Sequence, residues 1–110
     1  MSLSTHVLDT MHGRPAAGVK IVLTAADKLI YEGLTDADGR CPGLRALEIG
    51  GGQYRLSFSA GDYFRGLGVA LSDPAFLDVI TIEFGMADGC GHYHVPLLVS
   101  PYAYSTYRGS

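Results

Sequence analysis

Short segments in which apolar and polar residues alternate recur along the chain. Between residues 53 and 59, Tyr54, Leu56 and Phe58 alternate with polar side chains, which places the three apolar side chains on one face of an extended strand. Comparable segments follow at short intervals and are separated by turn-forming residues. We expect strands at residues 4–10, 19–24, 29–35, 44–47, 53–59, 78–84, 92–100 and 102–107.

Glycine and proline mark the turns between these segments. The chain has 15 Gly and 5 Pro, and the Asp-Gly pair at residues 38–39 suits a tight turn in which the glycine adopts a positive φ. One segment departs from strict alternation: Phe64, Leu67 and Leu71 recur at three- and four-residue intervals, which predicts a short helix within residues 61–71. The pattern as a whole predicts an all-β protein, a two-sheet β-sandwich of about eight strands with one short helix.

Length and composition limit the chain to one folded domain. With 47% hydrophobic and 17% charged residues, residues 1–110 have enough apolar side chains for a single core. The net charge of -3 lacks the excess of cations that binding to nucleic acid needs. No apolar run approaches the ~20 residues of a membrane span, and the first residues lack the pattern of a secretory signal. We therefore expect no nucleic-acid or membrane partner and a cytoplasmic location.

The last predicted strand is unusually aromatic. It carries Tyr102, Tyr104 and Tyr107, and a strand at the edge of a sheet needs protection from unwanted pairing. The tyrosines either cover the core of their own chain or lie in an interface between subunits. The second interpretation predicts an oligomer.

Motifs of the common enzyme classes are missing. The sequence has no glycine-rich nucleotide loop, no Gly-x-Ser-x-Gly nucleophile turn and no His-Glu-x-x-His metal helix. Cys41 and Cys90 lie far apart with no metal-binding spacing, so we interpret them as reduced thiols without a catalytic role. Candidate chemistry therefore rests on histidine and arginine.

Two histidines share one face of a predicted strand. His92 and His94 are two residues apart, and His6 lies in the first predicted strand. Three interpretations remain open for the pair. The imidazoles bind a metal, or they make structural hydrogen bonds, or one of them acts as a general acid and base, since imidazole titrates near neutral pH.

Two arginines lie where strands give way to loops. Arg40 follows the predicted turn, and Arg108 is close to the C-terminus. Planar guanidinium groups bind planar, oxygen- and nitrogen-rich anions through paired hydrogen bonds. The alternative for each is a solvated surface side chain.

Several segments together resemble one known family. The terminal Tyr-Arg-Gly-Ser at residues 107–110 is the most specific of them, and it distinguishes enzymes of this family from true transthyretins. In these segments the chain resembles the 5-hydroxyisourate hydrolase family of transthyretin-related proteins. The resemblance extends over nearly the whole chain, through residues 6–10, 13–16, 35–40, 92–98 and 100–110.

The resemblance implies a fold, a reaction and an assembly. The fold would be the transthyretin-like sandwich. The reaction would be hydrolysis of 5-hydroxyisourate to 2-oxo-4-hydroxy-4-carboxy-5-ureidoimidazoline in urate degradation, a branch of purine metabolism, with no metal and no organic cofactor. The assembly would be a homotetramer, a dimer of dimers, with each site lying between subunits.

The resemblance also assigns the site. His94 or His6 would take a proton from the attacking water, while Arg40 would bind the anionic substrate and stabilise charge on the carbonyl oxygen. Tyr107 would contact substrate, the residues after it would close the pocket or orient the histidines, and a covalent route through Ser110 is the less favoured alternative. The residues so assigned are His6, Arg40, His94, Tyr107, Arg108, Gly109 and Ser110, with His92 in a supporting role.

Two other functions remain as alternatives. A non-catalytic carrier of small aromatic anions is possible on the same sandwich, because fold alone does not determine function. A metal-binding domain that uses His92 and His94 is the third interpretation. The joint presence of His6, Arg40 and His94 with the terminal tetrapeptide favours the enzyme, since a passive carrier has no need of them.

Overall fold

The computed structural model describes residues 1–89 and 91–109, and within them β-strands are the main regular structure. Two short helices interrupt the strands, α1 (Pro42–Arg45) and α2 (Ala60–Gly66). The strands are β1 (Ser2–Ser4), β2 (Val7–Asp9), β3 (Arg14–Pro15), β4 (Lys20–Ala25), β5 (Lys28–Leu34), β6 (Gly52–Ser59), β7 (Val79–Met86), β8 (His92–His94), β9 (Leu97–Ser100) and β10 (Ala103–Thr106).

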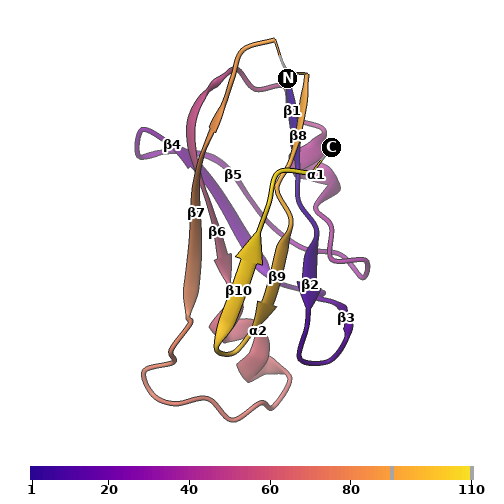
Figure 1. Cartoon of the computed structure of the whole chain (residues 1–110), viewed down its shortest axis with the longest axis vertical. Helices are drawn as coiled ribbons and strands as arrows, with labels where there is room; N and C mark the ends of the chain where they lie inside the picture. Colours follow the sequence, from indigo (N-terminus) through magenta and orange to yellow (C-terminus); the bar gives the residue numbers. More distant parts are fainter. Residues whose placement is uncertain (90, 110) are drawn as a thin grey trace.

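The strands form two main sheets. One has the order β5-β4-β6-β7 and is antiparallel throughout, and the other has the order β10-β9-β2-β3. Figure 1 shows the two sheets as separate layers, with the first chiefly on the left and the second on the right. A small parallel sheet of β1 and β8 continues β2 and β9 toward the end of the molecule where both termini lie. The predicted two-sheet sandwich is confirmed.

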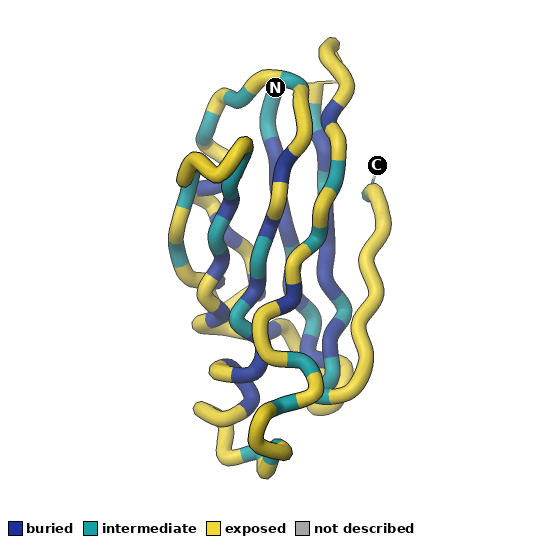
Figure 2. Tube along the Cα trace, turned by 90° about the vertical axis from the view of Figure 1, so that its left-hand side faces the viewer, coloured by how far each residue is buried: buried dark blue, intermediate teal, exposed yellow. Residues whose placement is uncertain are grey.

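The core lies between the two sheets, and it is built by the alternation seen in the sequence. Leu56 and Phe58 of β6 are fully buried, as the pattern predicts, and Tyr54 is nearly so. Figure 2 shows buried positions alternating with exposed ones along the strands. The second sheet contributes Val7, Leu97 and Val99 to the same core.

The strand expected at residues 44–47 is wrong, because this stretch contains the end of helix α1. Pro42 occupies the first turn of the helix, where its missing N–H has no partner to lose. The Arg45 N–H donates to the Cys41 carbonyl at 3.3 Å and the Ala46 N–H to the Pro42 carbonyl at 3.0 Å. Leu44 is the one buried residue of this short helix. A single buried apolar side chain in such a short segment does not distinguish a helical turn from a strand.

Two predicted strands are each divided in the structure. The segment 4–10 gives part of β1 and all of β2, and the segment 92–100 gives β8 and β9. The division falls beside Pro96, which has no N–H for the ladder. The Thr5 hydroxyl donates to the Val95 carbonyl at 2.7 Å at this point, so the two strands stay side by side without a regular ladder.

Helix α2 confirms the expected short helix, although it is shorter than the segment 61–71. It ends at Gly66 because Gly68 has φ of 80°, which closes the last turn. The Val69 N–H donates to the Phe64 carbonyl at 3.1 Å and the Gly68 N–H to the Arg65 carbonyl at 3.0 Å. These two bonds form a Schellman motif.

The tyrosines of the last strand do not cover the core of their own chain. Tyr102, Tyr104 and Tyr107 are 65%, 46% and 59% exposed. Figure 2 shows the segment that leads to the C-terminus as exposed almost throughout. The first of the two interpretations of these tyrosines is therefore wrong for the single chain.

In the described part of the chain, no helix has the length and apolar character that crossing a membrane requires.

Candidate active site

The two histidines of β8 lie beside the serines of β1. The strands pair in parallel, with Ser2 opposite His92 and Ser4 opposite His94. The Ser4 Oγ atom lies 2.8 Å from His94 Nδ1 and 2.9 Å from His92 Nε2. One serine thus contacts both imidazoles, which confirms that His92 and His94 project from the same face of the strand.

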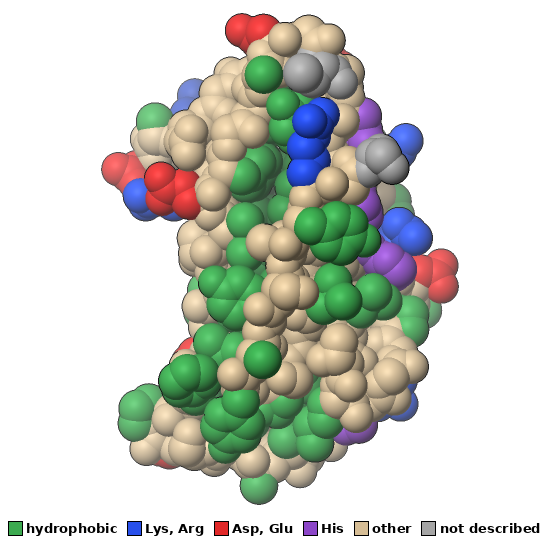
Figure 3. Space-filling view, viewed as in Figure 1, with side chains coloured by type: hydrophobic (Ala, Val, Ile, Leu, Met, Phe, Trp, Pro, Cys, Tyr) green, Lys and Arg blue, Asp and Glu red, His purple; other side chains and the backbone are tan. Residues whose placement is uncertain are grey.

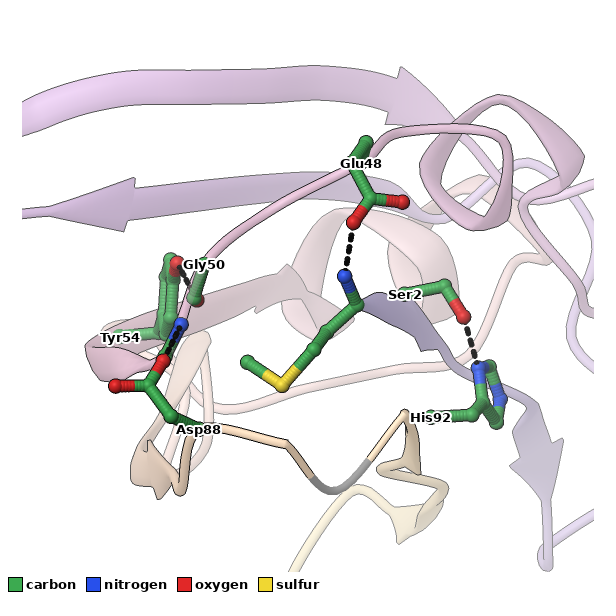
Figure 4. Close-up of polar contacts among 8 residues, drawn as sticks. Ser2, Glu48, Gly50, Tyr54, Asp88 and His92 are labelled. Atoms are coloured by element: carbon green, nitrogen blue, oxygen red, sulfur yellow. Dashed lines mark hydrogen bonds and ion pairs between the residues drawn. The ribbon is translucent and has the colours of Figure 1, made fainter.

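His92 has further polar partners. Its Nδ1 atom lies 2.6 Å from the Ser2 Oγ, a contact drawn in Figure 4, and its Nε2 atom lies 3.1 Å from Nη1 of Arg45. Burial, followed by the charge of Arg45, lowers the pKa of His92. His92 is therefore a neutral, hydrogen-bonded imidazole at neutral pH.

A tight turn brings Arg40 to the same region. The Asp36 carboxylate accepts the N–H groups of Asp38 and Arg40 at 2.9 and 3.0 Å, and Gly39 has φ of 74°, as predicted for this turn. Arg40 then forms an isolated antiparallel bridge with His6, and the Val7 N–H donates to the Gly39 carbonyl at 2.8 Å. The turn thus positions Arg40 directly beside the start of β2.

The C-terminal segment closes over His94. The Gly109 N–H donates to the His94 carbonyl at 2.7 Å. A Cβ atom at residue 109 would lie 2.6 Å from His94 Cδ2 and 3.0 Å from its Cβ. Only glycine fits against the imidazole at this distance, so Gly109 limits how the ring is oriented.

The environment of His94 favours its neutral form. Burial lowers its pKa most, followed by electrostatic interaction with Arg40 and then with His6, His92 and Arg45. A neutral imidazole keeps a free lone pair on one ring nitrogen, which can accept the proton of an attacking water. His94 therefore has the properties of a general base at neutral pH.

A small pocket lies next to this cluster. It has a volume of about 140 Å³ and is lined by Ser4, Thr5, Arg40, Cys41, Pro42 and Arg45. Its described lining includes two arginines and no acidic residue, so it attracts anions. Figure 3 shows histidine side chains along one edge of the upper half of the molecule, with Lys or Arg side chains beside them.

A larger hollow lies elsewhere. It has a volume of about 530 Å³ and lies between the β4–β5 turn and the start of β6, with Arg55 and Glu83 in its lining. These two side chains form an ion pair at 3.1 Å. No histidine is among its described lining residues, so size alone does not locate the candidate chemistry.

Tyr107 and Arg108 lie apart from the imidazoles in the single chain. The Arg108 guanidinium stacks over the Tyr93 ring, 4.2 Å from its centroid. Both residues line an apolar groove of about 250 Å³ together with Phe84 and Val95. Ser110, which was also assigned to the site, lies outside the described residues.

The remaining candidates are accounted for by local contacts. His12 Nδ1 lies 2.6 Å from the buried Asp9 carboxylate at the other end of the sheet. Burial raises the pKa of the Cys41 thiol, which matches an unreactive cysteine. Cys90 lies outside the described residues. Among residues 1–89 and 91–109 there is no cluster of three metal-ligating side chains.

Three polar residues of the cluster were not singled out from the sequence. Ser2 and Ser4 alternate with His6 at the start of the chain, which is the pattern of one strand face. That pattern does not reveal that β8 lies alongside. Nothing in the sequence distinguishes Arg45 from a solvated surface arginine, because its contact with His92 depends on helix α1, which the sequence did not predict.

The chain is similar to known proteins over its full described length. A sequence model of the HIUase/Transthyretin family matches residues 3–109. The protein named 5-hydroxyisourate hydrolase in Pseudomonas aeruginosa is 53% identical, with coverage of 98% of this chain and 90% of the relative. The protein of the same name in Mesorhizobium japonicum is 55% identical, with coverage of 98% and 91%.

Solved structures agree. The 5-hydroxyisourate hydrolase of Klebsiella pneumoniae superposes with a TM-score of 0.87 at 33% identity over the whole of both chains. Sea bream transthyretin in complex with thyroxine has a TM-score of 0.86 at 30% identity, covering 99% of this chain and 95% of that one. An (S)-allantoin synthase has a TM-score of 0.91 at 44% identity, and the present chain spans only 43% of its length. On sequence and on fold, the chain belongs to the HIUase/Transthyretin family.

Proposed function

We propose that this chain is a 5-hydroxyisourate hydrolase in which His94, His6 and Arg40 carry the chemistry. The observation that supports this most is the convergence of the three side chains. His6 and Arg40 are bridged through their backbones, and both side chains interact electrostatically with the His94 imidazole. The names of the relatives at 53% and 55% identity support the same substrate.

The proposed reaction is a metal-free hydrolysis. Water attacks a ring carbonyl of the substrate and gives its proton to neutral His94, while the Arg40 guanidinium stabilises the negative charge that develops on the carbonyl oxygen. The tetrahedral intermediate then breaks the carbon–nitrogen bond of the six-membered ring. His94 returns the proton to the leaving nitrogen, so the imidazole is regenerated and no cofactor is consumed.

The lining of the pocket supports an anionic substrate. Arg40 and Arg45 are the charged residues among its described lining, and neither takes part in an ion pair among the described side chains. Their charge is available to a planar, oxygen-rich anion, for which guanidinium is well suited.

The proposed site is shared between subunits of a homotetramer built as a dimer of dimers. In one chain the pocket is only about 140 Å³, whereas sites for small molecules usually enclose roughly 300 Å³ or more. A neighbouring chain would supply the missing walls. The exposed tyrosines in and beside β10 and the apolar groove at Tyr107 support burial of this edge.

We further propose that residues 1–110 form a single hydrolase domain and that the enzyme works in the cytoplasm. The buried, free thiol of Cys41 suits a reducing compartment.

The test is an ultraviolet absorbance time course on freshly generated 5-hydroxyisourate in the presence of a chelator. Wild type is compared with His94→Asn and with buffer, because the substrate also decays unaided. His12→Asn is the matched control, since it makes the same change in a histidine at the other end of the sheet. We expect chelator-resistant acceleration by wild type and by the control, and a loss of at least ~10²-fold in His94→Asn.

The other outcomes identify the alternatives. No acceleration by folded wild-type protein would favour a carrier of small aromatic anions, which the likeness to transthyretin allows. Acceleration that the chelator abolishes would favour a metal site at His92 and His94.

A further inference from the structure

A continuous series of polar contacts runs from the surface to the proposed base. Arg45 of α1 contacts His92, His92 contacts Ser4, and Ser4 contacts His94. The three distances are 3.1, 2.9 and 2.8 Å. The contacts join helix α1 to the two parallel strands, so they arise only in the folded chain.

The chemistry of the donors assigns the protons along this series. A guanidinium group only donates, so the His92 Nε2 atom that faces Arg45 accepts and carries no proton. His92 is neutral at neutral pH, and its single ring proton therefore lies on Nδ1, where it is donated to the Ser2 Oγ at 2.6 Å. The Ser2 contact is the one drawn in Figure 4.

Ser4 then determines which ring nitrogen of His94 carries the proton. Because His92 Nε2 has no proton, its contact with Ser4 requires that the serine hydroxyl donates, so the single lone pair of Nε2 is shared between the Arg45 N–H and the Ser4 O–H. That hydroxyl has one proton, so toward His94 the Ser4 oxygen can only accept. The proton in this last contact must belong to His94 Nδ1, which leaves Nε2 of His94 without a proton.

We propose that Arg45, His92 and Ser4 form a positioning relay that holds neutral His94 in the form with its proton on Nδ1, so that Nε2 presents a lone pair to the attacking water. This rests on the proposed hydrolase function. In a serine protease the carboxylate that orients the catalytic histidine has the equivalent task. Here a serine and a second imidazole, polarised by an arginine, perform it.

The ring is held on more than one side. Ser4 binds the Nδ1 side, and Gly109 lies against the Cδ2 side so closely that no Cβ fits between them. The charged and titratable groups that act on His94 are Arg40, His6, His92 and Arg45. None of these is a carboxylate, so a proton on Nε2 has no anionic partner among the described groups that act on the ring.

The closing experiment measures the tautomer and the rate separately. Nitrogen NMR of histidine side chains, recorded on ¹⁵N-labelled protein without substrate, reports which ring nitrogen of His94 carries the proton. The rate is measured with 5-hydroxyisourate on wild type, Ser4→Ala, Ser4→Thr and Arg45→Gln. Arg55→Gln is the matched control, because Arg55 is also exposed and lies on the other sheet.

We expect a protonated Nδ1 in wild type and in Arg55→Gln. Ser4→Ala and Arg45→Gln should shift the proton toward Nε2 and lower kcat by ~10-fold or more, with a smaller change in KM. Ser4→Thr, which keeps the hydroxyl, should restore both. Arg45 is exposed, so Arg45→Gln remains informative even where the buried Ser4→Ala folds poorly.

A proton found on Nε2 in wild type would overturn the relay, and so would unchanged spectra and kcat in Arg45→Gln. The hydrolase proposal fails separately, if wild type shows no turnover at all. In that case the spectra, which need no substrate, still decide the tautomer.

Discussion

His94 combines a lowered pKa with defined neighbours, and both follow from a few side chains. Ser4 holds Nδ1, Gly109 packs against the ring, and Arg40 contributes positive charge without an acidic partner among the described ion pairs. The result is an imidazole that stays unprotonated where an exposed histidine would begin to charge.

This predicts the pH dependence of the activity. Burial and the nearby cations lower the pKa of folded His94 below the ordinary value of about 6.5. The active, neutral form is therefore retained as the pH falls to about 6.5 and is lost only below it. We expect kcat/KM to be level near neutral pH and to fall on the acid side, with a midpoint below about 6.5.

Arg40→Gln provides the internal comparison for this pH profile. Removing the cation raises the pKa of His94, so the acid limb of the residual activity should move to higher pH. The lowered pKa of His94 also affects the stability of the fold. Because the unfolded chain binds more protons at this group than the folded chain does, the free energy of unfolding decreases as the pH falls. A wild-type midpoint above about 6.5 would contradict the assignment.

At the scale of elements, the terminal segment after β10 contacts β8 through Arg108, which stacks over Tyr93, and through Gly109, which packs against His94. Gly109→Ala would bring a methyl group within 2.6 Å of the His94 ring. The segment or the ring must move, so we expect kcat to fall by ~10-fold or more while thermal stability changes little, because the segment is largely exposed. Gly66→Ala, where a Cβ meets nothing within 4 Å, is the control. Full activity in Gly109→Ala would show that the position of the terminal segment does not affect the chemistry at His94.

A buried carboxylate joins β2 to helix α2 at the other end of the molecule. The Asp9 side chain accepts from the Tyr63 hydroxyl at 2.7 Å and from the His12 N–H at 2.9 Å. Burial alone would raise the pKa of Asp9, but these hydrogen bonds outweigh it and lower the pKa. The ionised form of Asp9 therefore stabilises the fold at neutral pH.

Tyr63→Phe tests this contact. It removes one bond to a charged group, so we expect a loss of about 1.5–3 kcal/mol in the free energy of unfolding by urea at neutral pH. Because the folded pKa is lowered, the contribution is present above the unfolded value of about 3.9 and is lost as the pH falls through the folded pKa. The difference between variant and wild type should shrink in strong acid. Tyr102→Phe, whose ring is exposed, should have little effect at any pH.

At the scale of the whole molecule, three exposed tyrosines lie in or directly beside the edge strand β10: Tyr102, Tyr104 and Tyr107. An isolated chain leaves these tyrosines in water, and the apolar groove beside Tyr107 continues the patch toward β7. The proposed tetramer buries this surface and completes the pocket, so assembly and activity are expected to depend on each other.

Tyr104→Glu places a charge on this edge and should lower the average mass in sedimentation equilibrium. Activity per chain should fall in parallel and recover as the protein concentration rises. Leu29→Glu is the matched control, because Leu29 is similarly exposed but lies on β5 at the edge of the other sheet. Full activity in a demonstrably monomeric Tyr104→Glu sample would refute the shared pocket.

Local pattern alone was enough for much of this protein. Alternation within one segment predicted the buried face of β6, and a spacing of two residues placed His92 and His94 on one face. The Asp-Gly turn before Arg40 was also predicted correctly, since it depends on adjacent residues. The strand predicted at residues 44–47 was wrong, because a single turn of helix buries Leu44 just as a short strand would.

What joins these pieces was decided by the tertiary structure. Ser4 and His94 are separated by 90 positions, and their contact depends on the parallel pairing of β1 with β8. Which strands pair, and in which register, depends on how the whole core packs. The spacing of residues within one segment does not reveal it. The sequence by itself therefore determined which side chains share a face, and only the fold determined that a serine lies between two imidazoles and that a glycine closes over one of them.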